Sequence, residues 1–376
     1  MKIAILGAGM VGRTMAIDLL EKYEVTSFDL SANALAILKE RAPGVETQQT
    51  DLQKYAGYKE MLSGFDFVVT AVPGFMGYKT LEAVIRAGKN VADISFFPED
   101  ALGLDALAKE YKVTAIVDCG VAPGMSNYVI GYHNEQMNIS SFECMVGGLP
   151  VVRVKPFEYK APFSPIDVIE EYTRPARLME NGHIVTRPAL SDPELVDFPQ
   201  VGTLESFNTD GLRSILYTMG HIPNMKERTL RYPGHIGLIK ALMKGGFFQS
   251  ETIRFRGMDI SPLEFSSALL LEQWRSRPDE DEFTVMSIKV TGEKGGKTVS
   301  YTYDLFDRYD PVAGLSSMSR TTGFTCTASL QLMINGLFNE KGVFPPELVG
   351  KHEPCFRFVM QYLKDRNVNY AVKEEY

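Results

Sequence analysis

Residues 2–20 read KIAILGAGMVGRTMAIDLL, and this stretch decides the fold. It begins with a short apolar run (Lys2–Leu6), continues through the pattern G-x-G-x-x-G, and ends in apolar residues at helical spacing (Thr14–Leu20). A strand, a glycine turn and a helix in this order form the fingerprint of a dinucleotide-binding site. Glycine-rich turns alone are common, so the flanking strand and helix make the pattern specific.

Each glycine in such a turn has its own physical role. Gly7 permits the tight turn, Gly9 lets the backbone approach a pyrophosphate, and Gly12 lets the helix pack close to the strand. The N-terminus of the helix that follows presents free N–H groups and a partial positive charge to an anion, and Met10 and Val11 lie in the turn that leads into it. We expect these five residues to bind the phosphates of the cofactor.

An acidic residue closes the second expected strand. Glu24–Phe28 is that strand, and Asp29 follows it at the distance that the fingerprint predicts. A carboxylate there accepts hydrogen bonds from a ribose 2′-hydroxyl and repels a 2′-phosphate, and Leu30 and Ser31 follow rather than an arginine. We therefore expect NAD rather than NADP, bound near Asp29 and Leu30. The alternative is a turn aspartate beside the helix that begins near Ser31.

Composition bounds the class of protein. The chain has 376 residues, enough for two domains, and its 45% hydrophobic and 23% charged residues are ordinary for a globular protein. A net charge of −8 argues against nucleic acid or an anionic membrane as the main partner. No apolar run approaches the roughly 20 residues of a membrane span, and the N-terminus lacks a signal-peptide pattern. The 4 cysteines are scattered, which favours reduced thiols over a disulfide framework or a metal site. We expect a cytoplasmic protein without a metal.

The first 120 residues alternate expected strands and helices. Six strands joined by crossover helices predict a doubly wound parallel sheet, the Rossmann domain of an α/β protein. The expected strands are 2–6, 24–28, 45–50, 66–72, 90–94 and 113–118. Ligands of such sheets bind outside the carboxyl ends of the strands. The residues there that we expect to border the cofactor are Asp51, Ala71, Val72, Pro73, Asp93 and Gly120. Asp51 fits a turn or helix cap equally well, and the alternative for Asp93 is a solvated loop residue.

The pattern changes after Gly124. Strand-like segments at 141–146, 284–291 and 298–304 predict an inserted α+β domain with a mixed, largely antiparallel sheet. From about residue 325 the chain is helical again, and we expect it to return to the first domain. The expected division is 1–124 for dinucleotide binding, 125–324 for the inserted domain, and 325–376 for the returning segment.

A series of short motifs runs along nearly the whole chain. They are 7–12 (GAGMVG), 118–125 (DCGVAPGM), 147–150 (GGLP), 158–159 (EY), 163–164 (FS), 171–172 (EY), 175–176 (PA), 209–213 (TDGLR), 229–235 (TLRYPGH) and 342–347 (GVFPPE). In this order they resemble the saccharopine dehydrogenase-like superfamily, most closely its lysine 6-dehydrogenase branch. The resemblance implies an NAD(P)-dependent oxidoreductase acting on the C–N bond of an amino acid, with a Rossmann domain completed by the C-terminal segment. It also implies that the inserted domain, 125–324, serves substrate binding and dimerisation, and that the protein is usually a homodimer. Two departures, at Asp93–Phe97 and at Lys160, leave the identity of the amino acid open.

Oxidation of an amine by hydride transfer needs a base for the ammonium proton and a cation for the substrate carboxylate. Arg213 and Arg231 are the candidate cations, because the planar guanidinium fork matches a carboxylate; the alternative for each is a structural ion pair. His235 is the candidate base, or else a histidine whose hydrogen bonds are satisfied inside the fold. Asp210 is expected to orient Arg213 or to meet a substrate ammonium. Weaker candidates are Tyr159, Lys160 and Arg320.

Three functions remain open from the sequence. The leading one is an NAD-dependent lysine 6-dehydrogenase, which converts L-lysine to 2-aminoadipate 6-semialdehyde and ammonia. The second is a reductive condensation that makes a secondary amine such as saccharopine or carboxynorspermidine; it usually runs with NADPH, which Asp29 disfavours. The third is a non-catalytic dinucleotide-binding paralogue, against which the arginine and histidine motifs argue.

Overall fold

The structure is a computed structural model that describes residues 1–161, 165–277 and 280–376. The Phe163–Ser164 motif therefore lies outside the described residues. The chain forms two compact units, each assembled from separate stretches of sequence. The first unit comprises Met1–Ile139, Gly292–Thr298 and Met318–Asn369, and the second comprises Ser140–Thr291, Val299–Ser317 and Tyr370–Tyr376.

A seven-stranded sheet in the order β17-β6-β5-β4-β1-β2-β3 forms the centre of the first unit. Every neighbouring pair runs parallel. The strands are β1 (Lys2–Leu6), β2 (Glu24–Asp29), β3 (Glu46–Gln49), β4 (Phe67–Thr70), β5 (Asn90–Asp93), β6 (Thr114–Ile116) and β17 (Gly342–Phe344). The expected doubly wound Rossmann sheet is confirmed. The seventh strand was not expected: β17 pairs with β6 through Val343 and Ala115.

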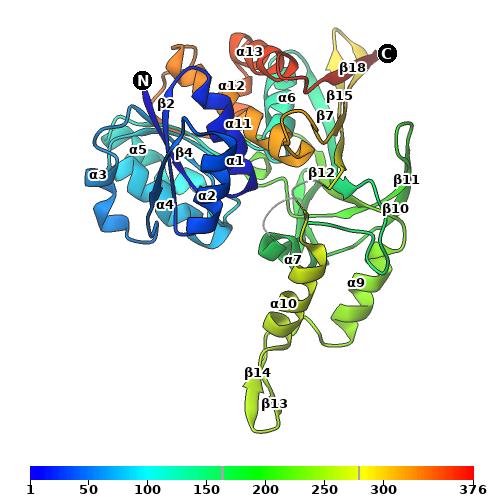
Figure 1. Cartoon of the computed structure of the whole chain (residues 1–376). Coiled ribbons are helices and arrows are strands. Elements are labelled where there is room, and N and C mark those ends of the chain that lie inside the picture. The colour runs from blue at the N-terminus through cyan, green and yellow to red at the C-terminus, as the bar shows by residue number, and fades with distance from the viewer. Residues whose placement is uncertain (162–164, 278–279) are drawn as a thin grey trace. The chain divides into compact units, whose positions relative to one another are not determined.

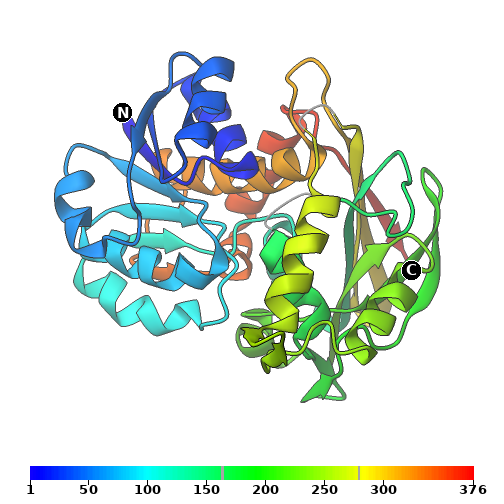
Figure 2. The same cartoon turned by 60° about the horizontal axis from the view of Figure 1, so that its bottom comes forward.

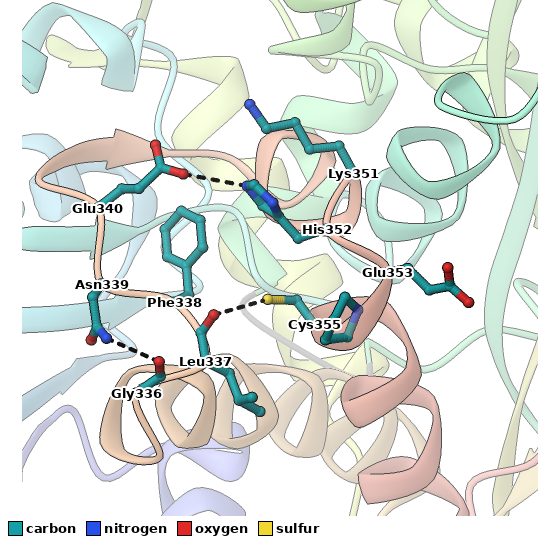
Figure 3. Close-up of a pocket in the computed structure, with 10 residues that line it drawn as sticks. Gly336, Leu337, Phe338, Asn339, Glu340, Lys351, His352, Glu353 and Cys355 are labelled. Atoms are coloured by element: carbon teal, nitrogen blue, oxygen red, sulfur yellow. Dashed lines mark hydrogen bonds and ion pairs between the residues drawn. The ribbon is translucent and has the colours of Figure 1, made fainter.

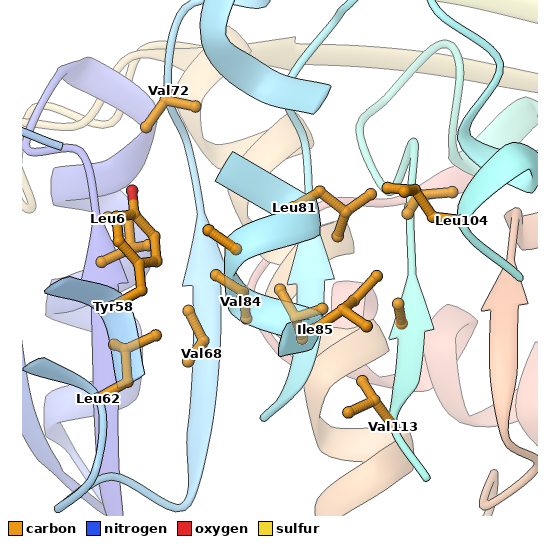
Figure 4. Packing of buried hydrophobic residues seen from close by; sticks show 14 of the residues in the cluster. Leu6, Tyr58, Leu62, Val68, Val72, Leu81, Val84, Ile85, Leu104 and Val113 are labelled. Carbon is orange, nitrogen blue, oxygen red and sulfur yellow. The ribbon is translucent and has the colours of Figure 1, made fainter. Parts of the chain in front are cut away.

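Helices and apolar side chains cover the sheet. The helices between the strands are α1 (Met10–Leu20), α2 (Ala32–Arg41), α3 (Tyr58–Met61), α4 (Gly74–Arg86) and α5 (Asp105–Glu110). Figure 4 shows Val68 of β4 beside Val84 and Ile85 of α4, and all three are fully buried. Val69, which points to the other side of the same strand, is also fully buried. Burial on both faces explains why β4 is a continuous apolar run rather than an alternating one.

The C-terminal segment supplies further helices to the first unit, namely α11 (Ser317–Ile334), α12 (Pro346–Gly350) and α13 (Glu353–Lys364). In Figure 2 the orange α11 lies beside the blue N-terminal elements. Thr14 Oγ1 donates to Ser319 Oγ at 2.9 Å, and Thr327 Oγ1 donates to Asp18 Oδ2 at 2.6 Å. These bonds join α11 to α1, so the first unit is completed by residues about 300 positions further along the chain.

The unit boundaries differ from the expected ones at both ends of the insertion. Helix α6 (Met125–Asn134) packs on α12 so closely that a Cβ on Gly131 would lie 2.2 Å from the carbonyl oxygen of Glu347. The first unit therefore extends to Ile139. The last residues of the chain also belong to the second unit, because β18 (Tyr370–Glu375) joins the sheet of that unit.

A mixed sheet in the order β10-β11-β12-β7-β15-β16-β18 forms the second unit, with β8 paired to β12 and β9 paired to β8. The strands are β7 (Asn138–Pro150), β8 (Ala176–Glu180), β9 (His183–Arg187), β10 (Glu194–Phe198), β11 (Gly202–Asn208), β12 (Asn224–Arg231), β15 (Glu282–Lys294), β16 (Lys297–Arg308) and β18. Of the described pairings, only β12–β7 is parallel. The expected mixed, largely antiparallel sheet is confirmed.

The helices of the second unit are α7 (Pro165–Thr173), α8 (Ile215–Thr218), α9 (His235–Lys244) and α10 (Pro262–Trp274). Trp274 at the end of α10 is fully buried in an aromatic cluster with Phe157, Tyr159 and Tyr172. A separate hairpin of β13 (Ile253–Phe255) and β14 (Met258–Ile260) extends beyond the first turn of α10 in Figure 1.

Candidate functional site

The glycine turn after β1 has the geometry of a phosphate-binding turn. Gly7 has φ +112°, and a Cβ there would lie 2.3 Å from the carbonyl oxygen of Ala71. A Cβ on Gly12 would lie 2.1 Å from the carbonyl oxygen of Gly7. A Cβ on Gly9, in contrast, would meet no atom within 4 Å. Packing inside the protein therefore requires Gly7 and Gly12, whereas Gly9 faces open space at the N-terminus of α1, as the approach of a pyrophosphate demands.

Asp29 ties the end of β2 to this turn. Its Oδ2 accepts a hydrogen bond from the backbone N–H of Ala8 at 2.7 Å, and its Oδ1 accepts from the N–H of Ser31 at 2.7 Å. The bond from Ser31 matches the alternative role, a turn aspartate beside the next helix. The bond from Ala8 holds the carboxylate against the glycine turn. Each carboxylate oxygen keeps a further lone pair, so Asp29 can still accept from ribose hydroxyls. The neighbouring Leu30 side chain is exposed.

The other expected cofactor residues lie at the ends of strands in the same unit. Ala71 donates its N–H to the carbonyl oxygen of Leu6 at 2.9 Å, and Val72 and Pro73 lead from there into α4. Asp51 Oδ1 accepts from the N–H of Gln53 at 3.0 Å, which is a local turn contact.

Gly120 belongs to a tight turn after β6. The N–H of Met125 donates to the carbonyl oxygen of Gly120 at 3.0 Å. A Cβ on Gly124 would lie 1.8 Å from that oxygen, so only glycine fits there. The turn gives the expected Gly120 a fixed position at the carboxyl end of β6 and starts helix α6.

Asp93 at the end of β5 is buried rather than solvated, with 1% of its surface exposed. Its Oδ1 accepts from the hydroxyl of Thr70 and from the N–H of Ser95, the latter at 3.0 Å. Its Oδ2 is buried and has no hydrogen-bond partner among the described residues. Burial raises the pKa of Asp93 to about 7, and the charge of Asp118 contributes in the same direction. This carboxyl group therefore exchanges a proton near neutral pH.

In the second unit, Arg231 is the centre of a buried polar network. Its Nε donates to the hydroxyl of Tyr172 at 3.0 Å, and its Nη2 donates to Glu171 Oε2 at 2.9 Å. Its Nη1 donates to the carbonyl oxygen of Leu230 at 3.0 Å, and the guanidinium lies 4.3 Å from the ring centroid of Tyr159. Burial lowers the pKa of Arg231, but Tyr159, Tyr172 and Glu171 outweigh it, and the pKa is raised overall. Arg231 is charged, and its fork is engaged by protein groups.

His235 joins the same network as a neutral side chain. Its Nδ1 lies 2.9 Å from the carbonyl oxygen of Phe157, which can only accept, so Nδ1 carries the hydrogen. Its Nε2, 2.9 Å from the hydroxyl of Tyr172, is then the acceptor. Burial, together with the charge of Arg231, lowers the pKa of His235 to about 3. Both ring nitrogens are occupied, and the ring stays neutral at physiological pH.

Three of the remaining expected residues, Asp210, Lys160 and Arg320, bond to groups outside this network. Asp210 forms a two-pronged ion pair with Arg177, at 2.8 Å and 2.9 Å. Arg213 is buried, and its backbone is in the left-handed region with φ +49°. Lys160 Nζ donates to carbonyl oxygens at the end of α10, at 3.0 Å and 3.2 Å. In the first unit, Arg320 donates to the carbonyl oxygen of Arg366 at 3.0 Å.

Sequence reasoning missed three of these roles. Glu171 and Tyr172 stand in a recognised motif, but nothing local to them indicates a contact with Arg231. No sequence pattern indicated that Arg177 pairs with Asp210, because Arg177 lies in β8 and Asp210 lies in the loop after β11.

A surface pocket of 710 Å³ lies elsewhere in the first unit, between residues 336–340 after α11 and residues 351–355 at the start of α13 (Figure 3). His352 Nε2 lies 3.3 Å from Glu340 Oε1 there. None of the expected site residues lines this pocket. Within the described parts of the chain, no cluster of three or more His, Cys, Asp or Glu side chains is placed to hold a metal. No described helix has the length and apolarity to cross a membrane.

Comparison with known proteins covers both units. The family model described as "Saccharopine dehydrogenase NADP binding domain" matches residues 3–116, and "Saccharopine dehydrogenase C-terminal domain" matches residues 118–368. The chain is 22% identical to carboxyaminopropylagmatine dehydrogenase of Synechocystis over 92% of each chain. Apo saccharopine dehydrogenase (L-Glu forming) of Saccharomyces cerevisiae has a TM-score of 0.80 at 18% identity, with 100% of both chains covered. Homospermidine synthase of Legionella pneumophila, solved with NAD, has a TM-score of 0.66 at 14% identity, covering 100% of this chain and 91% of the other.

The family models span the glycine turn, the strand-end residues and the Arg231 network alike. The first unit is thus a pyridine-nucleotide-binding domain, and the protein is an NAD(P)-dependent dehydrogenase. The resemblance found in the sequence motifs is confirmed: the chain belongs to the saccharopine dehydrogenase family.

Proposed function

We propose that this protein oxidises or forms a C–N bond of an amino acid, with Asp93 exchanging the proton. When bound, the pyridine nucleotide supplies the acceptor or donor of the hydride. The protein itself has to hold the substrate carboxylate and remove the ammonium proton, because a cationic nitrogen cannot help to expel a hydride.

Asp93 is the observation that carries this proposal. A general base works best when its pKa lies near the operating pH, and the pKa of Asp93 is raised to about 7 by burial. The residue ends β5, at the carboxyl edge where ligands of doubly wound sheets bind. Thr70 and Ser95 hold one carboxyl oxygen, which leaves Oδ2 to accept the proton.

His235 is the weaker base by the same criterion. A pKa of about 3 means that the ring holds a proton poorly at neutral pH. We assign His235 and Tyr172 to the positioning of Arg231 instead.

Arg213 is our candidate for the group that binds the substrate carboxylate. Arg213 stands in the loop-rich middle of the chain, and its left-handed backbone costs energy, which the surrounding structure must offset to hold it there. Its side chain is buried, as a carboxylate anchor in a water-excluded site would be.

Two substrate classes fit this chemistry. L-Lysine is the first: its oxidation yields 2-aminoadipate 6-semialdehyde and ammonia. A secondary amine such as saccharopine or carboxynorspermidine is the second. The similarity to carboxyaminopropylagmatine dehydrogenase over 92% of both chains, and the fold of yeast saccharopine dehydrogenase, favour the second class. A non-catalytic paralogue would have no need of a carboxyl group that titrates near neutral pH.

The preferred nucleotide is part of the proposal. Asp29 places a carboxylate beside the glycine turn, which favours NAD by repelling a 2′-phosphate. The matching family model is described as NADP binding, which points to the other nucleotide. We propose NAD and treat the affinity ratio of NAD to NADP as the measurement that decides.

The experiment is a turnover screen of the purified protein. Lysine, saccharopine and carboxynorspermidine are each offered with NAD or NADP, and the reduced nucleotide is followed by absorbance. Asp93→Asn should lower kcat by about 10²–10⁴ on the best substrate. Asp100→Asn is the matched control, because Asp100 is an exposed helix cap and asparagine caps equally well. Full activity of Asp93→Asn would refute Asp93 as the base, and no turnover on any amine would refute the proposed function.

A further inference from the structure

Arg213, the proposed anchor of the substrate carboxylate, lies in a short connecting segment of the second unit. The segment, residues 209–214, follows β11 and leads into α8. Its arginine is buried and holds a left-handed backbone conformation with φ +49°. A non-glycine residue in that conformation costs energy, so contacts on either side of Arg213 have to keep it in place.

Arg177 of β8 makes such contacts on both sides at once. Its Nε and Nη2 donate to Oδ1 and Oδ2 of Asp210 at 2.8 Å and 2.9 Å, three residues before Arg213. Its Nη1 donates to the hydroxyl of Tyr217 at 3.3 Å, four residues after Arg213. One planar guanidinium thus clamps the chain across the segment, and its fork fixes the carboxylate of Asp210 in two directions.

The clamp is built on the sheet of the second unit. Arg177 lies opposite Thr186 of β9, and β8 also pairs with β12 through Met179 and Met225. The backbone N–H of Arg177 adds a third bond to Asp210 Oδ1, at 3.1 Å. The side chain of Asp210 is 8% exposed, against 36% for that of Arg177. A carboxylate this buried depends on its cationic partner, because without one it would be an uncompensated charge.

Strand β12 holds the beginning of the same segment. The N–H of Thr209 donates to the carbonyl oxygen of Glu227 at 3.1 Å, and the hydroxyl of Thr229 donates to Thr209 Oγ1 at 3.1 Å. A Cβ on Gly211 would lie 1.7 Å from Glu227 Oε1, so the chain lies directly on that side chain. These contacts all come before Arg213, whereas the clamp from Arg177 reaches past it to α8.

We propose that Arg177 is a positioning residue for substrate binding, which holds residues 210–217 so that the guanidinium of Arg213 keeps the orientation that receives the substrate carboxylate. This role rests on the proposed function, in which Arg213 binds that carboxylate. A binding group has to stay within about 0.5 Å of its productive position. A loosened segment therefore weakens the binding of the amino acid, whereas the nucleotide, which binds to the first unit, keeps its affinity.

Steady-state kinetics of the full chain on the best amino acid of the turnover screen test this role. Arg177→Lys keeps the charge but loses the fork, so the KM for the amino acid should rise about 10-fold while kcat changes less than about 2-fold. Added to Arg213→Lys, it should not raise the KM further, because Arg177 acts through Arg213. Tyr217→Phe removes only the contact after Arg213 and should give a smaller rise in KM.

Arg187→Lys is the matched control. Arg187 of β9 forms a similar ion pair on the same hairpin, with its Nη2 at 2.9 Å and 2.7 Å from the two carboxylate oxygens of Glu180. Its described hydrogen bonds go to Glu180 and not to residues 209–217, so its replacement should leave the KM unchanged. Amide hydrogen exchange of peptides covering 209–217 gives a second measurement, independent of turnover. Exchange should be faster in Arg177→Lys than in the wild type and unchanged in Arg187→Lys.

The outcomes separate this role from the proposed function. An unchanged KM in Arg177→Lys, beside a raised KM in Arg213→Lys, would overturn the positioning role and leave the proposed function intact. Additive effects in the double variant would also overturn it, because Arg177 would then act on something other than Arg213. An unchanged KM in both single variants would remove Arg213 as the anchor, and the positioning role with it. Unaltered exchange at 209–217 would contradict the clamp even if the screen found no substrate, a result that would refute the proposed function separately.

Discussion

Replacement of Asp93 by asparagine should remove a large pH dependence of folding stability. The ordinary pKa of the carboxyl group is 3.8 and burial raises it to about 7, a difference of about 3 units. Each unit corresponds to about 1.4 kcal/mol, so the group carries about 4 kcal/mol of pH-dependent stability.

The sign follows from the proton count of the two states. Between about pH 4 and pH 7 the unfolded chain has lost this proton while the folded chain keeps it. The free energy of unfolding therefore falls as the pH rises through this window, and the stabilisation is lost once the pH passes the folded pKa of about 7. Asparagine cannot titrate, so Asp93→Asn should gain stability relative to the wild type by up to about 4 kcal/mol between pH 4 and pH 8.

Urea unfolding at a series of pH values measures this difference. Because the chain has two units, amide hydrogen exchange of β5 peptides should accompany the urea curves and report the first unit separately. Asp100→Asn serves again as the control and should follow the wild type at every pH. If the difference between the wild type and Asp93→Asn stayed constant to within about 1 kcal/mol across the window, the buried carboxyl would not titrate as argued.

Three further predictions test the two units. Gly7→Ala should destabilise the fold by about 2 kcal/mol or more, because its Cβ would meet Ala71 and its φ is positive. Gly9→Ala should keep the wild-type Tm but lower nucleotide affinity about 10-fold; unchanged affinity in a titration would contradict the role given to the turn. Asp29→Ala should weaken NAD binding and relax discrimination against NADP in fluorescence titrations, and a wild-type protein that prefers NADP would refute the choice of NAD. Arg231→Lys should lower the free energy of unfolding by about 2–3 kcal/mol in thermal unfolding, because the bonds to Tyr172 and Glu171 are lost. Arg213→Lys should mainly raise the KM for the amino acid. Full activity of both variants would show that neither arginine binds the substrate carboxylate.

Local sequence was enough to predict the nucleotide-binding half of the fold. The glycine turn, the flanking β1 and α1, and Asp29 at the end of β2 lie within 29 residues, and their arrangement follows from backbone geometry and strand order. The alternation of the second unit likewise predicted its mixed sheet. The family resemblance followed from motifs that keep one order along the chain.

Tertiary structure decided which sheet each late strand joins. β17 comprises only Gly342–Phe344, which is too short to show the alternation of a strand. Its pairing with β6 depends on where the helix before it ends in space. β18 looked like part of the returning segment, but β16 offered it an edge in the other unit. Strand pairing is a contact between distant residues, so composition and spacing within either strand do not specify the partner.

Tertiary structure also decided the chemistry of the ionisable side chains. Asp93 resembles any loop aspartate in the sequence, and its pKa near 7 arises only because the fold removes it from water. His235 and Arg231 stood in a recognisable motif, but Tyr172 comes from another helix and engages both of them. The desolvation of a side chain and its hydrogen bonds both depend on neighbours from separate segments of the chain. For that reason a local sequence pattern identifies the residue type at a site but does not determine its charge state.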